Sequence, residues 1–199
     1  MIVRHGNTFE SGEPPRRIGA RTDLPLTAAG LEQGHALGAH FAGLGWRFER
    51  VLVSPLARTR ETARAILSRL PRAPEPEPCD WLREIDHGPD EDKPEAAVLA
   101  RIGAQALSAW DERGEPPPGW SVDGDARRAA WRALFAAPPA GPTLLVTSNG
   151  AARFALSADP ALARAAADLA SLKLPTGSYG VIRRGPDGVW QVSGWGMRP

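Results

Sequence analysis

The pattern of hydrophobic and polar positions predicts short buried strands alternating with longer amphipathic helices. Strands are expected at residues 1–3, 51–53 and 143–147, where apolar runs are short and bounded by polar residues or turns. The last segments, residues 179–184 and 189–195, flank a Pro-Asp-Gly turn and predict a hairpin. Apolar residues at helical spacing predict helices at 28–41, from 54 to about 70, 95–113, 123–137, from 151, and 161–172.

The connecting segments are rich in glycine and proline. Residues 7–25 form a long loop, 71–78 a Pro/Glu linker, and 116–119 and 138–142 turns. Strands alternating with helices predict an α/β sandwich with a mostly parallel sheet. In such sheets ligands bind beyond the carboxyl ends of the strands. We therefore expect Arg4-His5-Gly6, Ser54 and Ser148-Asn149-Gly150 to meet in one crevice.

Composition is that of an ordinary globular chain. At 199 residues we expect one domain, and the net charge of +1 gives no general electrostatic reason to bind nucleic acid or acidic membranes. No apolar run approaches the roughly 20 residues of a membrane span. Arg4 and His5 stand where a signal peptide needs its apolar region, so a cytoplasmic location is expected. Cys79 is the only cysteine, and we interpret it as structural.

The tripeptide Arg4-His5-Gly6 carries the first candidate chemistry. An imidazole can attack phosphorus, and its neutral form is well populated near neutral pH. Arg4 offers planar donors to phosphate oxygens, and Gly6 lets the backbone approach a ligand closely. Taken alone the tripeptide is a weak signal, because a histidine at a strand end is often a hydrogen-bonded structural residue.

A second candidate lies where the helix after residues 51–53 begins. A helix amino terminus favours anions, and Arg58 stands in the first turn, from which it can reach a bound phosphate. Arg60 and Arg64 are interpreted as solvated charges that pair with Glu61. His35 and His40 lie five positions apart, which is not the i, i+4 spacing of a helical zinc pair, so no metal site is predicted.

Together these motifs resemble the histidine phosphatase superfamily, the phosphoglycerate mutase-like proteins. The resemblance rests on residues 4–6, 19–30 and 54–63, continues through 82–88 and 143–150, and includes the final hairpin. Only residues 89–140 match poorly, and we expect them to be a substrate-lid insertion in a single domain spanning residues 1–199. The family implies a three-layer α/β/α fold and a two-step mechanism that uses no metal or other cofactor.

The resemblance also implies roles by position. His5 would accept the phosphoryl group, while Arg4 and Arg58 would hold its equatorial oxygens. Glu84 would protonate the leaving group, for which a raised pKa is expected, and would then activate water. Asp86 is a second candidate for this acid.

One position departs from the family pattern in a way that bears on activity. The family normally has Ser-His-Gly where this chain has Ser148-Asn149-Gly150. Asn149 can donate an amide hydrogen bond to phosphate, with Gly150 beside it, but it supplies no positive charge. Because a hydrogen bond from a charged donor is stronger than one from a neutral donor, the replacement is expected to lower the rate by about one to two orders of magnitude. Arg21 and Arg153 are candidates for supplying the missing charge.

Further candidates are less specific. Asn7 is a possible phosphate contact, and the family's loop asparagine is replaced near Ser11. His87 stands where an apolar residue is common; it either assists Glu84 or the phosphate, or is a partly exposed loop histidine. Tryptophans 110, 120 and 131 fall in the expected lid, where they are either core residues or a ligand platform.

Three functions fit these residues. The first is a phosphatase acting on a small phosphomonoester, supported by Arg4, His5, Arg58 and Glu84 together. The second is a catalytically weakened relative that binds a phosphorylated ligand or partner, supported by Asn149. The third is a phosphomutase. The expected partner is a small phosphorylated molecule rather than nucleic acid or membrane.

Overall fold

A six-stranded sheet forms the middle layer of the protein. The computed structural model describes residues 1–137 and 140–199, so the predicted turn at 138–142 lies partly outside the described residues. The strand order is β3-β2-β4-β1-β5-β6; the first four are parallel, and β5 and β6 are antiparallel additions. The strands are β1 Ile2–Arg4, β2 Arg50–Val53, β3 Pro76–Pro78, β4 Thr143–Thr147, β5 Tyr179–Arg184 and β6 Trp190–Met197. This confirms the predicted α/β fold with a mostly parallel sheet.

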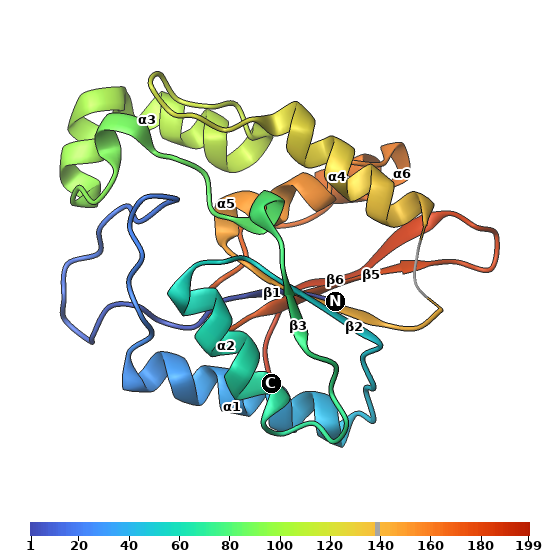
Figure 1. Cartoon of the computed structure of the whole chain (residues 1–199). Helices are drawn as coiled ribbons and strands as arrows, with labels where there is room; N and C mark the ends of the chain where they lie inside the picture. The colour runs from blue at the N-terminus through green and yellow to red at the C-terminus, as the bar shows by residue number, and fades with distance from the viewer. Residues whose placement is uncertain (138–139) are drawn as a thin grey trace.

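Helices cover both faces of the sheet, which makes three layers (Figure 1). One face carries α1 (Ala28–Gly43) and α2 (Ala57–Leu67). The other face carries α3 (Glu95–Arg113), α4 (Gly124–Ala136), α5 (Asn149–Ala152) and α6 (Pro160–Ala167). Short 3₁₀ turns lie at η1 (Asp80–Leu82), η2 (Gly88–Asp90) and η3 (Arg153–Ala155).

The alternation of side chains along the strands creates two cores. Val3, Val53 and Val146 belong to the cluster packed with α1 and α2. Leu52 and Leu145, their neighbours along the strands, belong to the cluster packed with the opposite helices. Successive strand residues point to opposite faces, so apolar runs only three to five residues long serve both layers.

Several element boundaries differ from prediction. The second helix begins at Ala57, not at Ser54, because Leu56 is still extended. The linker at 71–78 contains the edge strand β3, where proline is tolerated since no partner lies beyond it. The helix after β4 has only four residues, and α6 ends at Ala167 instead of about residue 172. Gly103, at φ 80°, interrupts α3.

Two glycines let α1 approach the segment that follows β1. A Cβ at Gly6 would overlap the Gly30 carbonyl, and a Cβ at Gly30 would overlap the Asn7 carbonyl. The predicted cap is present: Thr27 Oγ1 accepts from Gly30 N at 3.1 Å, and Thr27 N donates to the Asn7 carbonyl at 3.0 Å. These contacts fix the backbone directly after His5 against the helix.

Residues 89–137 contribute η2, α3 and α4 on one side of the sheet (Figure 1). Trp110 and Trp131 are fully buried there, and Trp120 is nearly so, which favours the core interpretation of these side chains. No helix in the described ranges is both long enough and apolar enough to cross a membrane.

Candidate active site

A pocket of about 530 Å³ lies at the carboxyl ends of β1 and β4. His5 enters it from the end of β1, Glu84 from the loop after η1, and Asn149 from the start of α5. The predicted convergence of distant loops is therefore present, except that Ser54 is fully buried and does not line the pocket. The lining residues are Arg4, His5, Asn7, Thr8, Phe9, Pro15, Arg16, Arg17, Ile18, Glu84, His87, Glu95, Trp110, Asn149, Gly150, Pro175 and Thr176.

His5 is held as a neutral imidazole with one nitrogen free. Its Nδ1 lies 2.7 Å from the Gly6 carbonyl, an acceptor, so Nδ1 carries the proton and Nε2 keeps its lone pair. Burial, together with the charges of Arg58 and Arg4, holds the pKa of His5 well below 6.5. Its backbone is fixed by a bond from His5 N to Thr147 O at 3.1 Å. Near neutral pH the ring is therefore unprotonated, the state in which an imidazole can act as a nucleophile.

Two arginines set the charge around this ring. Arg4 lines the pocket, and its Nη1 donates to Leu174 O at 2.7 Å. Burial lowers the pKa of Arg4 to about 10, which leaves it charged at neutral pH. Arg58 is wholly buried and does not line the pocket; it donates to Thr22 O at 2.8 Å and Gly19 O at 3.0 Å. Arg58 therefore shapes the loop at 19–22 while its charge reaches His5.

Glu84 is a buried carboxylate tied to backbone N–H groups. Oε1 accepts from Ile85 N at 2.9 Å, and Oε2 accepts from Gly150 N at 3.0 Å. Burial acts to raise the pKa of Glu84, but the charge of His87, both N–H groups and Arg58 outweigh it, so the pKa falls below 4.5. The expected raised pKa is thus wrong, because these donors favour the ionised form.

Asn149 and Gly150 use their polar groups to hold the site together. Asn149 Oδ1 accepts from Leu174 N at 2.9 Å, which ties the start of α5 to the segment that Arg4 also contacts. The N–H of Gly150 is given to Glu84, and a Cβ at position 150 would overlap Glu84 Oε1. A side chain at position 150 would therefore displace Glu84.

The two remaining loop candidates differ in position. Asn7 lines the pocket, and its Oδ1 accepts from Thr176 Oγ1 at 2.5 Å and from Gln33 Nε2 at 3.4 Å. Ser11 is exposed on the long loop and does not line the pocket.

The arginines expected to replace the missing charge lie elsewhere. Arg21 binds Asp86 at 3.0 Å on the outer side of the loop. Arg153 lies over the Trp110 ring at 4.1 Å and donates to the Trp110 carbonyl. Neither of these arginines lines the pocket.

Arg16 and Arg17 line the pocket instead, and sequence reasoning missed them. They are paired with Asp92 and Glu95, respectively. Their place in a long Pro/Gly loop between two motifs is the one local signal that could have drawn attention to them.

His87 is buried in the pocket wall, so its interpretation as a partly exposed loop histidine is wrong. Its Nδ1 lies 3.6 Å from Glu91 Oε2, and its ring meets Trp120 edge to face at 4.6 Å. Glu91 accepts bonds from Gly19 N, Arg21 N and His87 N and from the Thr22 hydroxyl, at 2.9–3.1 Å. Although burial opposes it, the His87 side chain and these bonds lower the pKa of Glu91 to about 2.

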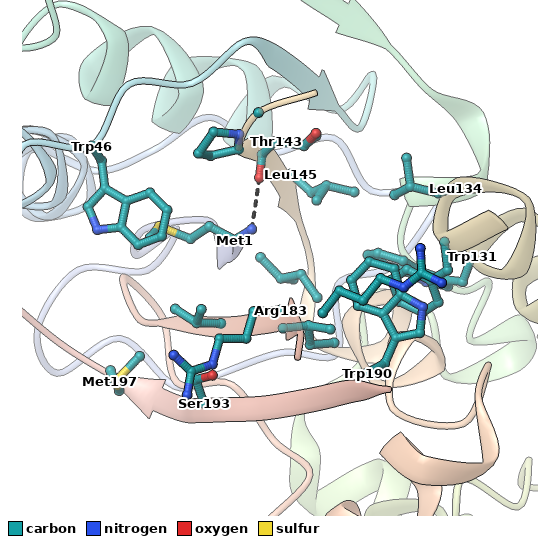
Figure 2. Close-up of a pocket in the computed structure, with 17 residues that line it drawn as sticks. Met1, Trp46, Trp131, Leu134, Thr143, Leu145, Arg183, Trp190, Ser193 and Met197 are labelled. Atoms are coloured by element: carbon teal, nitrogen blue, oxygen red, sulfur yellow. Dashed lines mark hydrogen bonds between the residues drawn. The ribbon is translucent and has the colours of Figure 1, made fainter. Parts of the chain in front are cut away.

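A second, more apolar pocket of about 590 Å³ lies near the amino ends of β1 and β4 (Figure 2). Trp46 borders one side, and Trp131 and Trp190 border the other; the Met1 amine donates to Thr143 O at 2.8 Å. The described residues that line it include no histidine, cysteine, aspartate or glutamate. The candidate catalytic side chains therefore line the smaller pocket and not this one.

Metal-binding residues do not gather in the described ranges: no group of three or more His, Cys, Asp or Glu side chains is placed to hold an ion. Cys79 is partly buried, and burial raises the pKa of its thiol.

Comparison with known families gives a match along almost the whole chain. The model of the histidine phosphatase superfamily (branch 1) matches residues 1–198. A 2,3-bisphosphoglycerate-dependent phosphoglycerate mutase from Rhizobium etli is 31% identical over 121 residues, 60% of this chain and 57% of that protein. Among similar curated relatives the matched share of their own length ranges from 38% to 64%.

Solved structures share the fold at low sequence identity. A mycobacterial glucosyl-3-phosphoglycerate phosphatase superposes with a TM-score of 0.76 and 21% identity, covering 98% of this chain and 96% of that one. The alpha-ribazole phosphatase of Shigella flexneri gives a TM-score of 0.72 and 22% identity, with 99% and 95% covered.

Proposed function

The chain belongs to the histidine phosphatase superfamily, and we propose that it hydrolyses a small phosphomonoester through a phosphohistidine formed on His5. The observation that carries this proposal is the state of His5. Its Nδ1 is committed to the Gly6 carbonyl, and its pKa is lowered by burial and by Arg58 and Arg4. A neutral ring that feels the charges of Arg58 and Arg4 combines a nucleophile with the charge that stabilises phosphoryl transfer.

In the first step His5 Nε2 attacks phosphorus, and the bond from phosphorus to the leaving oxygen breaks. Arg4 neutralises the phosphoryl oxygens from the pocket wall, and the buried Arg58 adds its positive charge from outside the pocket lining. The Asn149 amide group is available to donate a further hydrogen bond, since its Oδ1 is already bound to Leu174 N. Glu84 gives its proton to the leaving oxygen, which departs as an alcohol.

The lowered pKa of Glu84 leaves its carboxylate ionised near neutral pH, so its proton has to arrive with the substrate. A phosphomonoester has a second pKa of about 6, and its monoanion carries one proton into the pocket. The negative phosphoryl group also raises the pKa of a nearby carboxylate, which favours transfer of that proton to Glu84.

In the second step water attacks phosphorus, and the bond from His5 Nε2 to phosphorus breaks. Glu84, now ionised, accepts the proton of that water, and inorganic phosphate leaves. The N–H groups of Ile85 and Gly150 keep the carboxylate in place for both steps. We further propose that the described part of the 89–140 segment, residues 89–137, acts as the substrate lid. Arg16 and Arg17 would bring positive charge to the substrate end of the pocket.

The test uses p-nitrophenyl phosphate as substrate. We expect nitrophenol release and, after rapid alkaline quenching, an acid-labile phosphohistidine on the peptide containing His5. His5→Ala should abolish both signals. His35→Gln is the matched control, because His35 lies outside the pocket near Ser68 and its removal should leave both unchanged.

Two other functions remain distinguishable. A phosphomutase would convert 3-phosphoglycerate to its 2-isomer faster than it releases phosphate, a reaction suggested by the name of the Rhizobium relative. A binding protein would take up orthovanadate or phosphate in the pocket with no turnover and no adduct over a broad panel of phosphomonoesters. Either result would replace the phosphatase proposal.

A further inference from the structure

The backbone of Arg17, on the wall of the candidate pocket, is held by the segment that precedes α3. Its N–H donates to the Lys93 carbonyl at 2.8 Å, and its carbonyl accepts from Asp92 N at 2.8 Å. The residue before it, Arg16, pairs with Pro94 as an isolated antiparallel bridge. These contacts fix Arg17 although it belongs to the long loop after β1, so the direction in which its side chain leaves the loop is set.

The guanidinium group of Arg17 is oriented by an aromatic ring. Its Cζ lies 5.3 Å from the centroid of the Trp120 ring, a cation–π contact. The indole is itself fixed, because its Nε1 donates to Asp90 Oδ2 at 2.7 Å and Arg101 pairs with the same carboxylate. A guanidinium held on a fixed ring keeps its donors in one arrangement, and the planar fork of arginine matches the geometry of a carboxylate.

A carboxylate already stands beside this guanidinium group. Arg17 Nη2 pairs with Glu95 Oε2, and both side chains line the pocket together with His5 and Glu84. The side chain of Glu95 is 41% exposed, whereas that of Arg17 is 19% exposed. Exposed ion pairs contribute little stability, so Glu95 can turn into solvent at little cost while Trp120 keeps Arg17 in place. Glu95 therefore marks a place on the pocket wall where the carboxylate of a ligand would fit.

The other arginines of the pocket wall are less suited to this role. Arg4 is assigned above to the phosphoryl oxygens. Arg16 pairs with Asp92 and lies over Phe9 at 5.5 Å, but both side chains of that ion pair are more exposed than the side chain of Arg17. Arg17 is thus the cation that is held most firmly and has a partner it can exchange.

We propose that Arg17 is a specificity-determining residue that binds a carboxylate on the leaving group of the substrate, in the place that Glu95 occupies until the substrate displaces it. The preferred substrates are then phosphomonoesters that carry a carboxylate at the end away from phosphorus. The inference rests on the proposed phosphatase function for its kinetics, whereas the carboxylate subsite can be measured by binding alone.

The kinetic test compares two substrates of nearly the same size, 4-carboxyphenyl phosphate and 4-carbamoylphenyl phosphate, together with their 3-substituted isomers. For at least one isomer we expect kcat/KM to favour the carboxylate about tenfold, the scale of one hydrogen bond to a charged group. Arg17→Gln should remove this preference by lowering the value for the carboxylate substrate alone. Glu95→Gln, which removes the competing carboxylate, should raise it.

The control is Arg60→Gln, at an exposed position outside the pocket, which should leave the preference unchanged. The preference is a ratio of two values measured on the same protein. A loss of packing would lower both values and leave their ratio unchanged, so the ratio separates carboxylate binding from a structural effect of the substitution.

Binding is measured by calorimetry with 4-carboxybenzylphosphonate, its carboxamide analogue and the 3-substituted isomers, whose bond from phosphorus to carbon is not hydrolysed. The carboxylate analogue of the preferred isomer should bind about tenfold more tightly than the carboxamide. Arg17→Gln should make the two affinities equal, and Arg60→Gln should keep them apart.

The outcomes separate the subsite from the catalytic proposal. Equal affinities for carboxylate and carboxamide in both isomers, or equal kcat/KM values in an active enzyme, overturn the inference, and so does a preference that survives in Arg17→Gln. A preference for 4-(aminomethyl)phenyl phosphate also overturns it, because Glu95 would then bind an ammonium group. Binding of the carboxylate analogue that depends on Arg17, in a protein that neither turns over substrate nor forms phosphohistidine, supports the subsite and removes the phosphatase proposal.

Discussion

Replacing Gly150 by alanine places a methyl group against the proposed acid. The added Cβ overlaps Glu84 Oε1 and lies 3.1 Å from its Cδ and 3.2 Å from Ile85 Cγ1. Carbon atoms prefer separations of about 3.5–4.0 Å, so the carboxylate has to retreat by about 1 Å. The 3.0 Å bond from Gly150 N to Oε2 is then lost. A bond to a charged group stabilises by about 1.5–3 kcal/mol, and overpacking costs about 1–3 kcal/mol.

The effect on catalysis is measured with two substrates whose leaving groups differ in their need for a proton. An alkoxide needs the proton of Glu84, whereas nitrophenolate leaves without it. A shift of about 1 Å in a catalytic group costs about a hundredfold. We expect that loss in kcat/KM, which reports only the steps up to the phosphohistidine, for an alkyl phosphate, and a loss of about tenfold or less in kcat/KM for p-nitrophenyl phosphate. Gly43→Ala is the control, since its Cβ meets nothing within 4 Å. Equal losses on both substrates in a folded protein would refute the assignment of Glu84 as the acid.

Three further changes probe charge and packing. Because the pKa of His5 lies well below 6.5, its ring stays unprotonated as the pH falls from about 7.5 to about 6. The value of kcat/KM should therefore not fall in that window, and a decrease with an inflection near 6.5 would contradict this. Asn149→Asp keeps an acceptor for Leu174 N but places a negative charge beside the phosphate. We therefore expect kcat/KM to drop about a hundredfold, while the free energy of unfolding measured in urea changes little. Unchanged kinetics would mean that Asn149 lies away from the phosphate. Phe41→Ala removes a fully buried ring that packs edge-on against Tyr179 at 5.1 Å; the free energy of unfolding should fall by about 3–5 kcal/mol in urea titrations, while the folded protein keeps its kcat.

Local sequence signals were sufficient for the elements whose cause is local. Thr143–Thr147 is a strand with the predicted bounds, because an apolar run of this length after a turn has few alternatives. Thr27 caps α1 as predicted, since a hydroxyl can satisfy free N–H groups from within the same turn. Strand β3 was missed because Pro76 and Pro78 argue against a strand, and only its parallel pairing with β2 makes it one.

The candidate site likewise combines residues that the sequence could identify with residues that only packing brings into the pocket. The family resemblance placed His5, Glu84 and Asn149 among the candidates, and all three line one pocket. The pattern could not tell which arginines join them, because a side chain's direction depends on what packs around it. Arg21 turns outward to Asp86, whereas Arg17 turns inward.

Motifs in their order along the chain and the hydrophobic periodicity were enough to identify the family and the layered α/β architecture, because each motif and each element depends on a short stretch of residues. Tertiary packing decided the electrostatics. The pKa of Glu84 is lowered by Gly150, 66 positions later, and by the charge of His87. Burial acts to raise that pKa. The direction of the shift therefore depends on a balance between desolvation and hydrogen-bond donors that only the folded chain brings together.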